Sequence, residues 1–285
     1  MRTNKPYKLL ALDVDGTLLG RWNLIARETR EALARATERG VAITLATGRG
    51  FPSAAGIARR AGIRGPLVTH DGAYVADPAT GAVLAMERIP LNVVREAVAI
   101  LERCHLHPNL LHEQVRISNQ RFPEWNSRLL MPNHWADLAN LVREANDYPH
   151  MYVPNLSAYL AANSVKPPKL YVTGQPKRIA EGRALLEEHL GSVLRTTKAG
   201  PTGMEVMLKH VSKASGLKVL AEWLGIGAEE VIAVGDNYND VEMLRQAGLG
   251  VAMGNAPDEV KQAADHVTAR NVDHGVARVI EQFVI

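Results

Sequence analysis

The chain has 285 residues, of which 46% are hydrophobic and 22% are charged. This length suits one large domain or two ordinary ones, and the apolar content is sufficient for a core, so extended disorder is excluded. The 33 basic residues barely exceed the 30 acidic ones, which gives a formal net charge of +3. Because like charges do not gather in long runs, we predict no nucleic-acid partner and no membrane partner.

The expected compartment follows from the single cysteine and from the first apolar run. Cys104 has no second cysteine to pair with, which is typical of a reducing compartment. The apolar run Leu9–Leu12 stops at Asp13 and is too short for a secretory signal, and no stretch reaches the roughly 20 apolar residues of a membrane span. We therefore expect a cytoplasmic protein. As a separate expectation, the protein is a monomer or a weak homo-oligomer.

Strand-length apolar runs alternate with segments of helical period at both ends of the chain. This alternation predicts right-handed βαβ units and a parallel sheet, together with a hairpin of Tyr74–Ala76 and Ala82–Met86. The expected strands are Lys8–Val14, Val41–Ala46, Pro66–Thr69, Val231–Val234 and Leu249–Ala252. The expected helices are Glu28–Arg39, Phe51–Ala61, Ser212–Leu224, Tyr238–Gln246, Pro257–Ala264 and Gly275–Phe283.

The middle of the chain shows a different pattern of helices, short strands and proline-interrupted loops. Its last part, Ser192–Thr196 and Met204–Leu208 on either side of Gly200-Pro201, predicts a further hairpin. An α/β layer that is interrupted and then resumed implies an inserted domain. We therefore predict a Rossmann-like parallel-sheet core of residues 1–86 and 209–285, and an inserted α+β domain of residues 87–208.

Two aspartates, Asp13 and Asp15, come at the end of the first expected strand. Side chains at positions i and i+2 of a strand point the same way, about 6–7 Å apart, and parallel sheets bind ligands at the carboxyl ends of their strands. Gly16 then allows a sharp turn. The same residues could be solvated aspartates at a strand end or a calcium loop, although Leu18 stands where a calcium loop needs glycine.

A second apolar strand, Val231–Val234, leads into a polar group of four residues within five positions. They are Asp236, Asn237, Asn239 and Asp240. Asp236 or Asn237 could simply cap the helix that follows, but capping needs only one such residue. If this strand end meets the first one, Asp13, Asp15, Asp236 and Asp240 share one crevice.

Four carboxylates in one crevice would repel one another. Two like charges about 4 Å apart repel by about 4 kcal/mol at an effective dielectric constant of about 20. A divalent cation removes this conflict, and a small number of hard oxygen ligands favours Mg²⁺. A magnesium ion held by so few carboxylates keeps room for a substrate phosphate.

Two further segments offer groups for that phosphate. Thr47-Gly48-Arg49 follows the second strand and supplies a hydroxyl, an unhindered backbone N–H and a guanidinium. Lys213 opens a helix, so that an ammonium group and a helix N-terminus can face one anion. Taken alone, Thr47 suits a loop-stabilising hydroxyl and Lys213 a surface lysine, and only the convergence of four strand ends favours a phosphate site.

Together these residues resemble the haloacid dehalogenase (HAD) superfamily of phosphohydrolases, in its Cof-type sugar-phosphatase branch with a large α/β cap. The stretch Asp13-Val14-Asp15-Gly16-Thr17 is similar to the first motif of that family and Thr47-Gly48-Arg49 to the second. Lys213 matches the third motif, and Gly235-Asp236 with Asn239-Asp240 matches the fourth. The similarity continues through 250–257 and 273–277. The inserted domain is similar to the family's cap by position, length and closing hairpin.

The resemblance implies that Asp13 is a nucleophile that forms an aspartyl-phosphate intermediate. Asp15 would protonate the leaving alcohol and then deprotonate the attacking water. Mg²⁺ would lie between Asp13, the backbone carbonyl of Asp15, and Asp236. Phosphate binding would fall to Thr47, Gly48, Lys213 and Asn239, and the supporting residues would be Asp240, Gly16, Arg49 and Asp71.

Asp71 departs from the family's pattern. The family usually has Asn-Gly-Ala after the third strand, and this chain has Asp71-Gly72-Ala73. An acid there would repel a phosphate but could accept hydrogen bonds from sugar hydroxyls, so it bears on substrate choice. Asp240 would order Lys213 or a metal-bound water.

The activity implied by the resemblance is that of a Mg²⁺-dependent phosphatase acting on a small phosphorylated metabolite, first of all a sugar phosphate. A phosphomutase or phosphotransferase that passes the phosphoryl group to another hydroxyl stays open, as does a non-catalytic metabolite-binding protein. The cap would set the specificity and close over the core. In the cap, His112, Arg116 and Asn119 could reach a substrate or form a solvated strand face.

Overall fold

The computed structural model describes residues 7–112, 115–120, 149–199 and 202–285. The chain divides into two compact units, Met1–Ala85 with Ser212–Ile285, and Met86–Val211. The expected boundaries after residues 86 and 208 lie close to these limits. No helix in the described ranges is both long and apolar enough to cross a membrane.

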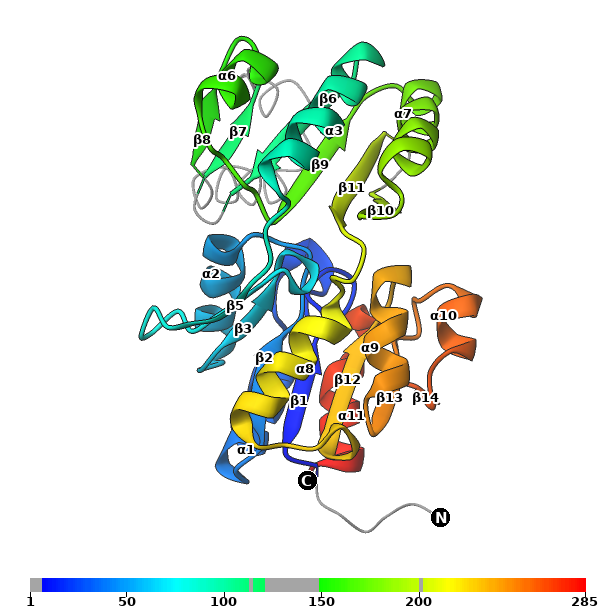
Figure 1. Ribbon diagram of the computed structural model, residues 1–285. Coiled ribbons are helices and arrows are strands. Elements are labelled where there is room, and N and C mark those ends of the chain that lie inside the picture. Colours follow the sequence, from blue (N-terminus) through cyan, green and yellow to red (C-terminus); the bar gives the residue numbers. More distant parts are fainter. Residues whose placement is uncertain (1–6, 113–114, 121–148, 200–201) are drawn as a thin grey trace. The chain divides into compact units, whose positions relative to one another are not determined.

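A parallel sheet of five strands, in the order β14-β13-β12-β1-β2, forms the centre of the first unit. From β1 the chain passes to β2 on one side, whereas β12 lies on the other side of β1 (Figure 1). The direction of winding therefore changes between β1 and β12, and such a switch point is where open parallel sheets bind ligands. The strands are β1 Leu9–Leu12, β2 Ala42–Leu45, β12 Val231–Gly235, β13 Leu249–Ala252 and β14 His266–Val267.

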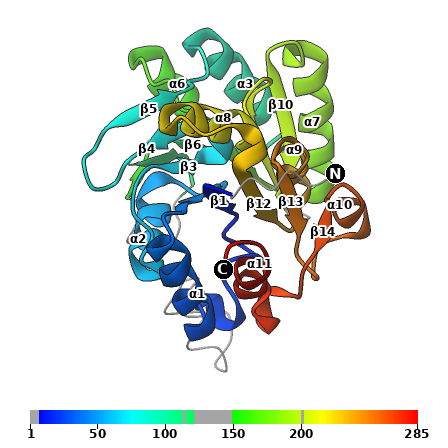
Figure 2. The ribbon, with the colours of Figure 1, turned by 90° about the horizontal axis from the view of Figure 1, so that it is seen from below.

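Helices cover both faces of this sheet (Figure 2). Side chains alternate along β1, so that Leu10 and Leu12 pack into one apolar layer, and Leu9 and Ala11 into the other. The first layer is completed by α1 Arg27–Glu38, α2 Phe51–Ala61 and α11 Gly275–Phe283. The second is completed by α8 Lys213–Leu224, α9 Val241–Gln246 and α10 Asp258–Gln262. Parallel strands buried on both faces explain the continuous apolar runs in the sequence.

The third expected strand does not join the parallel sheet as a full member. β3, Leu67–Thr69, touches the end of β2 through the single bridge Ala46–Val68. It instead heads a second sheet with β4, Tyr74–Ala76, and β5, Val83–Met86, which form the expected hairpin. The expected strand is therefore present and parallel to β2 at this bridge, but its main pairing is antiparallel with β4, because the three residues after β3 all have positive φ and turn the chain back.

The second unit is built on a six-stranded sheet in the order β10-β11-β9-β6-β7-β8, in which only β7 and β8 run parallel. Its strands are β6 His107–Leu111, β7 Arg116–Ser118, β8 His150–Tyr152, β9 Lys169–Thr173, β10 Leu194–Lys198 and β11 Gly203–Leu208. The helices α3 Leu91–Arg103 and α7 Pro176–Leu190 pack on it, and α6 Leu156–Ala162 packs against α3. β10 and β11 form the second expected hairpin, although 200–201 lie outside the described residues. The predicted fold class is thus confirmed.

Candidate active site

Asp13 emerges at the switch point of the core sheet. β1 ends at Leu12, and the N–H of Asp13 continues the ladder by donating to the carbonyl oxygen of Val234 at 2.9 Å. The Asp13 side chain is buried, and its Oδ1 accepts a hydrogen bond from Nζ of Lys213 at 2.6 Å. The same ammonium donates to Oδ1 of Asp240, also at 2.6 Å. Lys213 therefore links the two loops that follow β1 and β12.

Lys213 owes its position to the start of α8. Ser212 caps this helix, because its Oγ accepts from the N–H of Ser215 while Oγ of Ser215 accepts from the N–H of Ser212. Lys213 is only 1% exposed, so it is not the surface lysine that the sequence alone allowed. Its burial lowers the pKa of the ammonium, but neighbouring carboxylates more than offset this effect and raise the pKa above its usual value. The group is therefore a permanent positive charge.

In the loop after β12, some polar residues hold the loop together and Asp236 faces the neighbouring loop. Oδ2 of Asp240 accepts from the N–H groups of Asp236 and Asn237, each at 2.9 Å, and Asn237 caps the following turn η4, Tyr238–Asp240. Capping thus falls to Asn237 and Asp240. Asp236 faces the first loop instead, since its Oδ1 accepts from Oγ1 of Thr17 at 2.9 Å.

The carboxylates of Asp13, Asp236 and Asp240 form a compact acidic cluster, with one oxygen of each within 4.8 Å of the others. Burial raises the pKa of Asp13 well above its usual range, and burial raises the pKa of Asp236 to about 6. Carboxyl groups that resist ionising together are stabilised by a dication, and an all-oxygen donor set fits Mg²⁺. Each of the three carboxylates offers one oxygen to such an ion, and Asp240 also holds Lys213 and the backbone of its own loop.

Asp15 does not join this cluster, which corrects the expectation that four carboxylates crowd one crevice. The strand is shorter than predicted, so Asp15 lies beyond its ladder, where it forms an isolated bridge with Leu19. Arg49 holds the Asp15 carboxylate with two hydrogen bonds, from Nε at 2.7 Å and from Nη2 at 2.6 Å. Gly16 follows with a φ of 83°, where a Cβ would overlap the carboxylate of Asp236.

Thr47 and Gly48 lie at the same edge of the sheet, at the end of β2. Thr47 is 1% exposed, and its Oγ1 accepts from the N–H of Arg49 at 3.2 Å. The hydroxyl thus has the loop-stabilising function that the sequence allowed. Gly48 is half-buried in the bend between these two residues.

Asp71 and Asn239, which the sequence placed near the phosphate, form a pair. Nδ2 of Asn239 donates to Oδ1 of Asp71 at 2.9 Å. Asp71 is only 1% exposed. One oxygen of this carboxylate is therefore paired with a neighbouring side chain, and a contact of the acid with sugar hydroxyls stays a prediction.

Two functional residues were missed by sequence reasoning, although both belong to quoted motifs. Thr17 holds Asp236 as described, and Nδ2 of Asn255 donates to Oδ2 of Asp236 at 3.3 Å and to the carbonyl oxygen of Gly16 at 2.9 Å. Asn255 follows β13, the next strand of the same sheet. A polar residue just after a third strand end was the signal that could have identified it.

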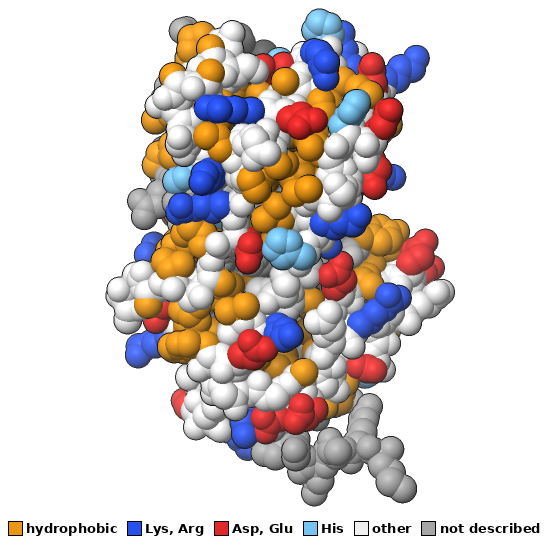
Figure 3. Space-filling model, in the orientation of Figure 1, with side chains coloured by type: hydrophobic (Ala, Val, Ile, Leu, Met, Phe, Trp, Pro, Cys, Tyr) orange, Lys and Arg blue, Asp and Glu red, His pale blue; other side chains and the backbone are white. Residues whose placement is uncertain are grey.

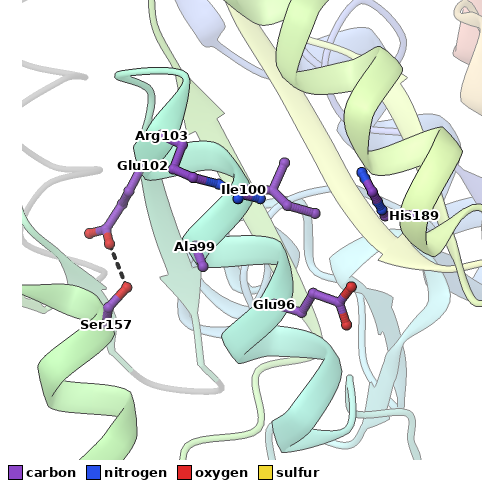
Figure 4. A pocket seen from close by; sticks show the side chains of 7 residues that line it. All are labelled: Glu96, Ala99, Ile100, Glu102, Arg103, Ser157 and His189. Carbon is purple, nitrogen blue, oxygen red and sulfur yellow. Dashed lines mark hydrogen bonds between the residues drawn. The ribbon is translucent and has the colours of Figure 1, made fainter.

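A cavity of about 520 Å³ lies in the second unit beside α3 (Figure 4). Its carboxylate Glu102 accepts from Oγ of Ser157 at 2.5 Å and from Nδ2 of Asn119 at 3.2 Å. Asn119 therefore ties the end of β7 to α3. His112 and Arg116 lie half-buried next to the same strand. The contacts of Glu102 join α3 to Ser157 of α6 and to the end of β7.

Comparison with known proteins agrees with this geometry. The family model described as haloacid dehalogenase-like hydrolase matches residues 10–280. This chain belongs to that family. The haloacid dehalogenase-like match spans both units, so the inserted unit is part of the family's architecture, and the prediction that the chain is a hydrolase is confirmed.

Named relatives and solved structures cover nearly the whole chain. The stress response protein YhaX of Bacillus subtilis is 32% identical over 278 residues, which is 97% of this chain and 93% of the relative. The 5-amino-6-(5-phospho-D-ribitylamino)uracil phosphatase YcsE of the same organism is 30% identical over 284 residues, which is 100% of this chain and 98% of YcsE. A haloacid dehalogenase-like hydrolase from Bacteroides thetaiotaomicron superimposes with a TM-score of 0.81 at 28% identity, covering 97% and 99%. The HAD subclass IIB sugar phosphatase BT4131 superimposes with a TM-score of 0.77 at 25% identity, and the match covers 98% of this chain and 100% of BT4131.

Proposed function

We propose that this protein is a Mg²⁺-dependent phosphatase that hydrolyses the phosphate monoester of a small metabolite through a phosphorylated Asp13. A sugar phosphate is the leading candidate for that substrate. The observation that carries the proposal is the buried contact of 2.6 Å between Asp13 and Lys213 at the switch point of the sheet. The names of the relatives support it, because YcsE is a phosphatase of a phosphoribityl compound and BT4131 a sugar phosphatase.

Lys213 makes Asp13 usable as a nucleophile. A carboxylate is repelled by a phosphate dianion, and the ammonium beside Oδ1 offsets that repulsion. An oxygen of Asp13 attacks phosphorus, the ester P–O bond breaks, and its electron pair leaves with the alcohol oxygen. Positioning and charge neutralisation are the main requirements of phosphoryl transfer.

Asp15 is the proposed proton carrier for both halves of the reaction. For the first half it carries a proton on an oxygen released from Arg49 and gives that proton to the departing alcohol oxygen, and later it takes a proton from the water that attacks the phosphorylated Asp13. The bond between phosphorus and the Asp13 oxygen then breaks, which releases inorganic phosphate and restores the carboxylate. Arg49, which holds both oxygens of Asp15, sets the direction of this side chain.

The magnesium ion would be held by Asp13, Asp236 and the backbone carbonyl of Asp15. When bound, it supplies positive charge that offsets the repulsion between the nucleophile and the phosphate. Thr17 and Asn255 keep the Asp236 carboxylate in place for this purpose. The phosphoryl oxygens would be bound by Thr47, Gly48, Lys213 and Asn239.

The inserted unit is the proposed cap, which would recognise the part of the substrate beyond the phosphate. A small metabolite suits the mixed surface of Figure 3, where acidic and basic side chains are interspersed on the face shown. We place the protein in the cytoplasm, because its single cysteine, Cys104, is a buried free thiol.

A panel of phosphorylated metabolites tests this proposal. With Mg²⁺ present, the protein should release inorganic phosphate from at least one sugar phosphate, and chelation of the metal should stop the release. Asp13→Asn should abolish turnover and keep the fold, whereas Asp258→Asn, at a side chain that is 87% exposed, should change neither.

The panel also separates the alternatives. Transfer of phosphate to an added sugar acceptor in place of water would identify a phosphotransferase. Binding of a phosphorylated compound without any turnover would identify a binding protein. Retained turnover in Asp13→Asn would exclude the proposed nucleophile.

A further inference from the structure

The turn at Asp71 and Gly72 contacts all three segments that carry the proposed phosphate ligands. Its backbone N–H donates to the carbonyl oxygen of Thr47 at 3.0 Å, and its Oδ1 accepts from Nδ2 of Asn239 at 2.9 Å. The charge of Asp71 also contributes to raising the pKa of Lys213, after the larger contributions of Asp13 and Asp240. Residues that follow β2 and β12 thus bond to Asp71, through its backbone and its side chain respectively, and the start of α8 packs on the adjoining Gly72.

The backbone at this point is arranged to deliver the carboxylate. Asp71 has a φ of 54°, a left-handed conformation that aspartate adopts more readily than most residues. Gly72 follows at 97°, where a Cβ would overlap the carbonyl oxygen of Ser212. The turn therefore packs directly on the start of α8, and Asp71 is buried to 1% exposure.

A carboxylate at this position constrains Asn239 in a way that an amide does not. An ionised carboxylate only accepts hydrogen bonds, so it must be faced by the Nδ2 group of Asn239. An asparagine at position 71 could accept or donate and would tolerate either orientation of its partner. With Asp71, one hydrogen of Nδ2 is fixed and the other is left for a ligand in a defined direction.

We propose that Asp71 is a positioning residue that locks the side-chain amide of Asn239, and so aligns the donors of Thr47, Lys213 and Asn239 on the phosphoryl group. This inference rests on the proposed function, in which those three residues bind phosphate. It assigns Asp71 to the phosphate site and not to the recognition of sugar hydroxyls.

A double-mutant cycle on p-nitrophenyl phosphate with Mg²⁺ tests the coupling. Asp71→Gly removes the carboxylate and suits the positive φ, and it should lower kcat/KM by about 10- to 100-fold, as should Asn239→Ala. Because the two residues act as a unit, the double variant should lose no more than about 2-fold beyond Asn239→Ala. Asp71→Asn, which can still accept from Nδ2, should recover most of the loss, and Asp258→Gly should behave as wild type.

The kinetic result overturns the proposal if Asp71→Gly keeps the wild-type kcat/KM, if the losses of the two single variants multiply in the double variant, or if Asp71→Asn is as slow as Asp71→Gly. Thermal unfolding midpoints show whether each variant is folded. Should Asp71→Gly not fold, Asp71→Ala, alone and combined with Asn239→Ala, measures the same coupling.

A second measurement does not depend on turnover. In ¹H–¹⁵N spectra the side-chain amide of Asn239, identified by its loss in Asn239→Ala, should have one proton protected from solvent exchange in the wild type. This protection should vanish in Asp71→Gly and persist in Asp258→Gly. An unchanged amide signal in Asp71→Gly overturns the positioning role, whereas a wild type inactive on every phosphate ester overturns only the proposed function.

Discussion

At the residue scale, the site is organised around a buried lysine. Removing Lys213 from water costs free energy, which the ion pairs with Asp13 and Asp240 offset. Burial of Asp13 and Asp240 also costs free energy, and the ammonium of Lys213 offsets that cost. An ion pair of this kind adds little net stability while intact, but it is costly to break.

Lys213→Met should therefore destabilise the protein strongly while keeping the volume of the side chain. We expect the free energy of unfolding to fall by about 3–5 kcal/mol in metal-free solution, because two buried carboxylates lose their counter-ion. Denaturant titration measures this change. Lys218→Met on the same helix is the matched control, since that side chain is 72% exposed and its change should stay within about 0.5 kcal/mol. Equal effects of the two substitutions would contradict the argument.

The pair of Asp15 and Arg49 has a different character, because the Asp15 side chain is 56% exposed. Solvent-exposed pairs contribute at most about 1 kcal/mol, so its value lies in orientation and not in stability. Arg49→Gln should leave the unfolding midpoint nearly unchanged. It should lower kcat more for an alkyl phosphate than for p-nitrophenyl phosphate, whose leaving group needs no proton. Steady-state kinetics on the two esters measures this difference. An equal loss of kcat on both esters would count against the role of Asp15 as an acid.

At the scale of elements, the sequence predicts those features that local patterns determine. The bounds of α2 and α11 agree with prediction to the residue, because helical periodicity is clear there and Gly62, with a φ of 74°, ends α2. The alternating burial of β1 likewise follows from its apolar run.

The features that the sequence did not predict depend on contacts distant in sequence. Asp15 leaves the cluster for Arg49, and Asp71 pairs with Asn239 across 168 positions. No local sequence pattern predicts either of these two pairings. A local exception is β3, whose main partner is β4, because the chain turns back at His70 and Asp71 with positive φ although neither residue is a glycine. The four motifs nevertheless identified the residues that the structure gathers at the sheet edge.

The contact between the turn after β3 and the start of α8 leads to a prediction at this scale. Gly72→Ala should push the Ser212 carbonyl away and shift Lys213, so that both stability and activity fall. Gly62→Ala is a matched control, because Gly62 also has positive φ but a Cβ there meets nothing within 4 Å. The control should cost about 1–2 kcal/mol from backbone strain alone. Denaturant titration showing no further loss in Gly72→Ala would refute the close packing.

At the scale of the whole molecule, the candidate metal site joins distant parts of the chain. Thr17 and Asp236, which meet at the site, are 219 positions apart, with the entire second unit between them in sequence. Any ion that binds there favours the folded core over the unfolded chain. A ligand present at about 100 times its dissociation constant adds about 2.7 kcal/mol of stability.

Mg²⁺ should accordingly raise the unfolding temperature of the wild type, and the shift should be lost in Asp236→Asn but kept in Asp258→Asn. Burial raises the pKa of Asp236 to about 6, so its ionisation opposes folding, and metal-free stability should rise as the pH falls through that value. The Mg²⁺ shift should shrink over the same range, because the ion must then displace a proton. Calorimetry that shows the same shift in Asp236→Asn would contradict the site.

The central claim is that the phosphoryl group passes through Asp13, and a rapid-quench experiment tests it most directly. Asp15→Asn mixed with p-nitrophenyl phosphate and Mg²⁺ should release about one equivalent of p-nitrophenol in a burst, because Asp13 can still attack while the base for hydrolysis is missing. Peptide mapping of the quenched protein should find one phosphoryl group on Asp13. A linear release without a burst, with Asp13 unmodified, would contradict the account.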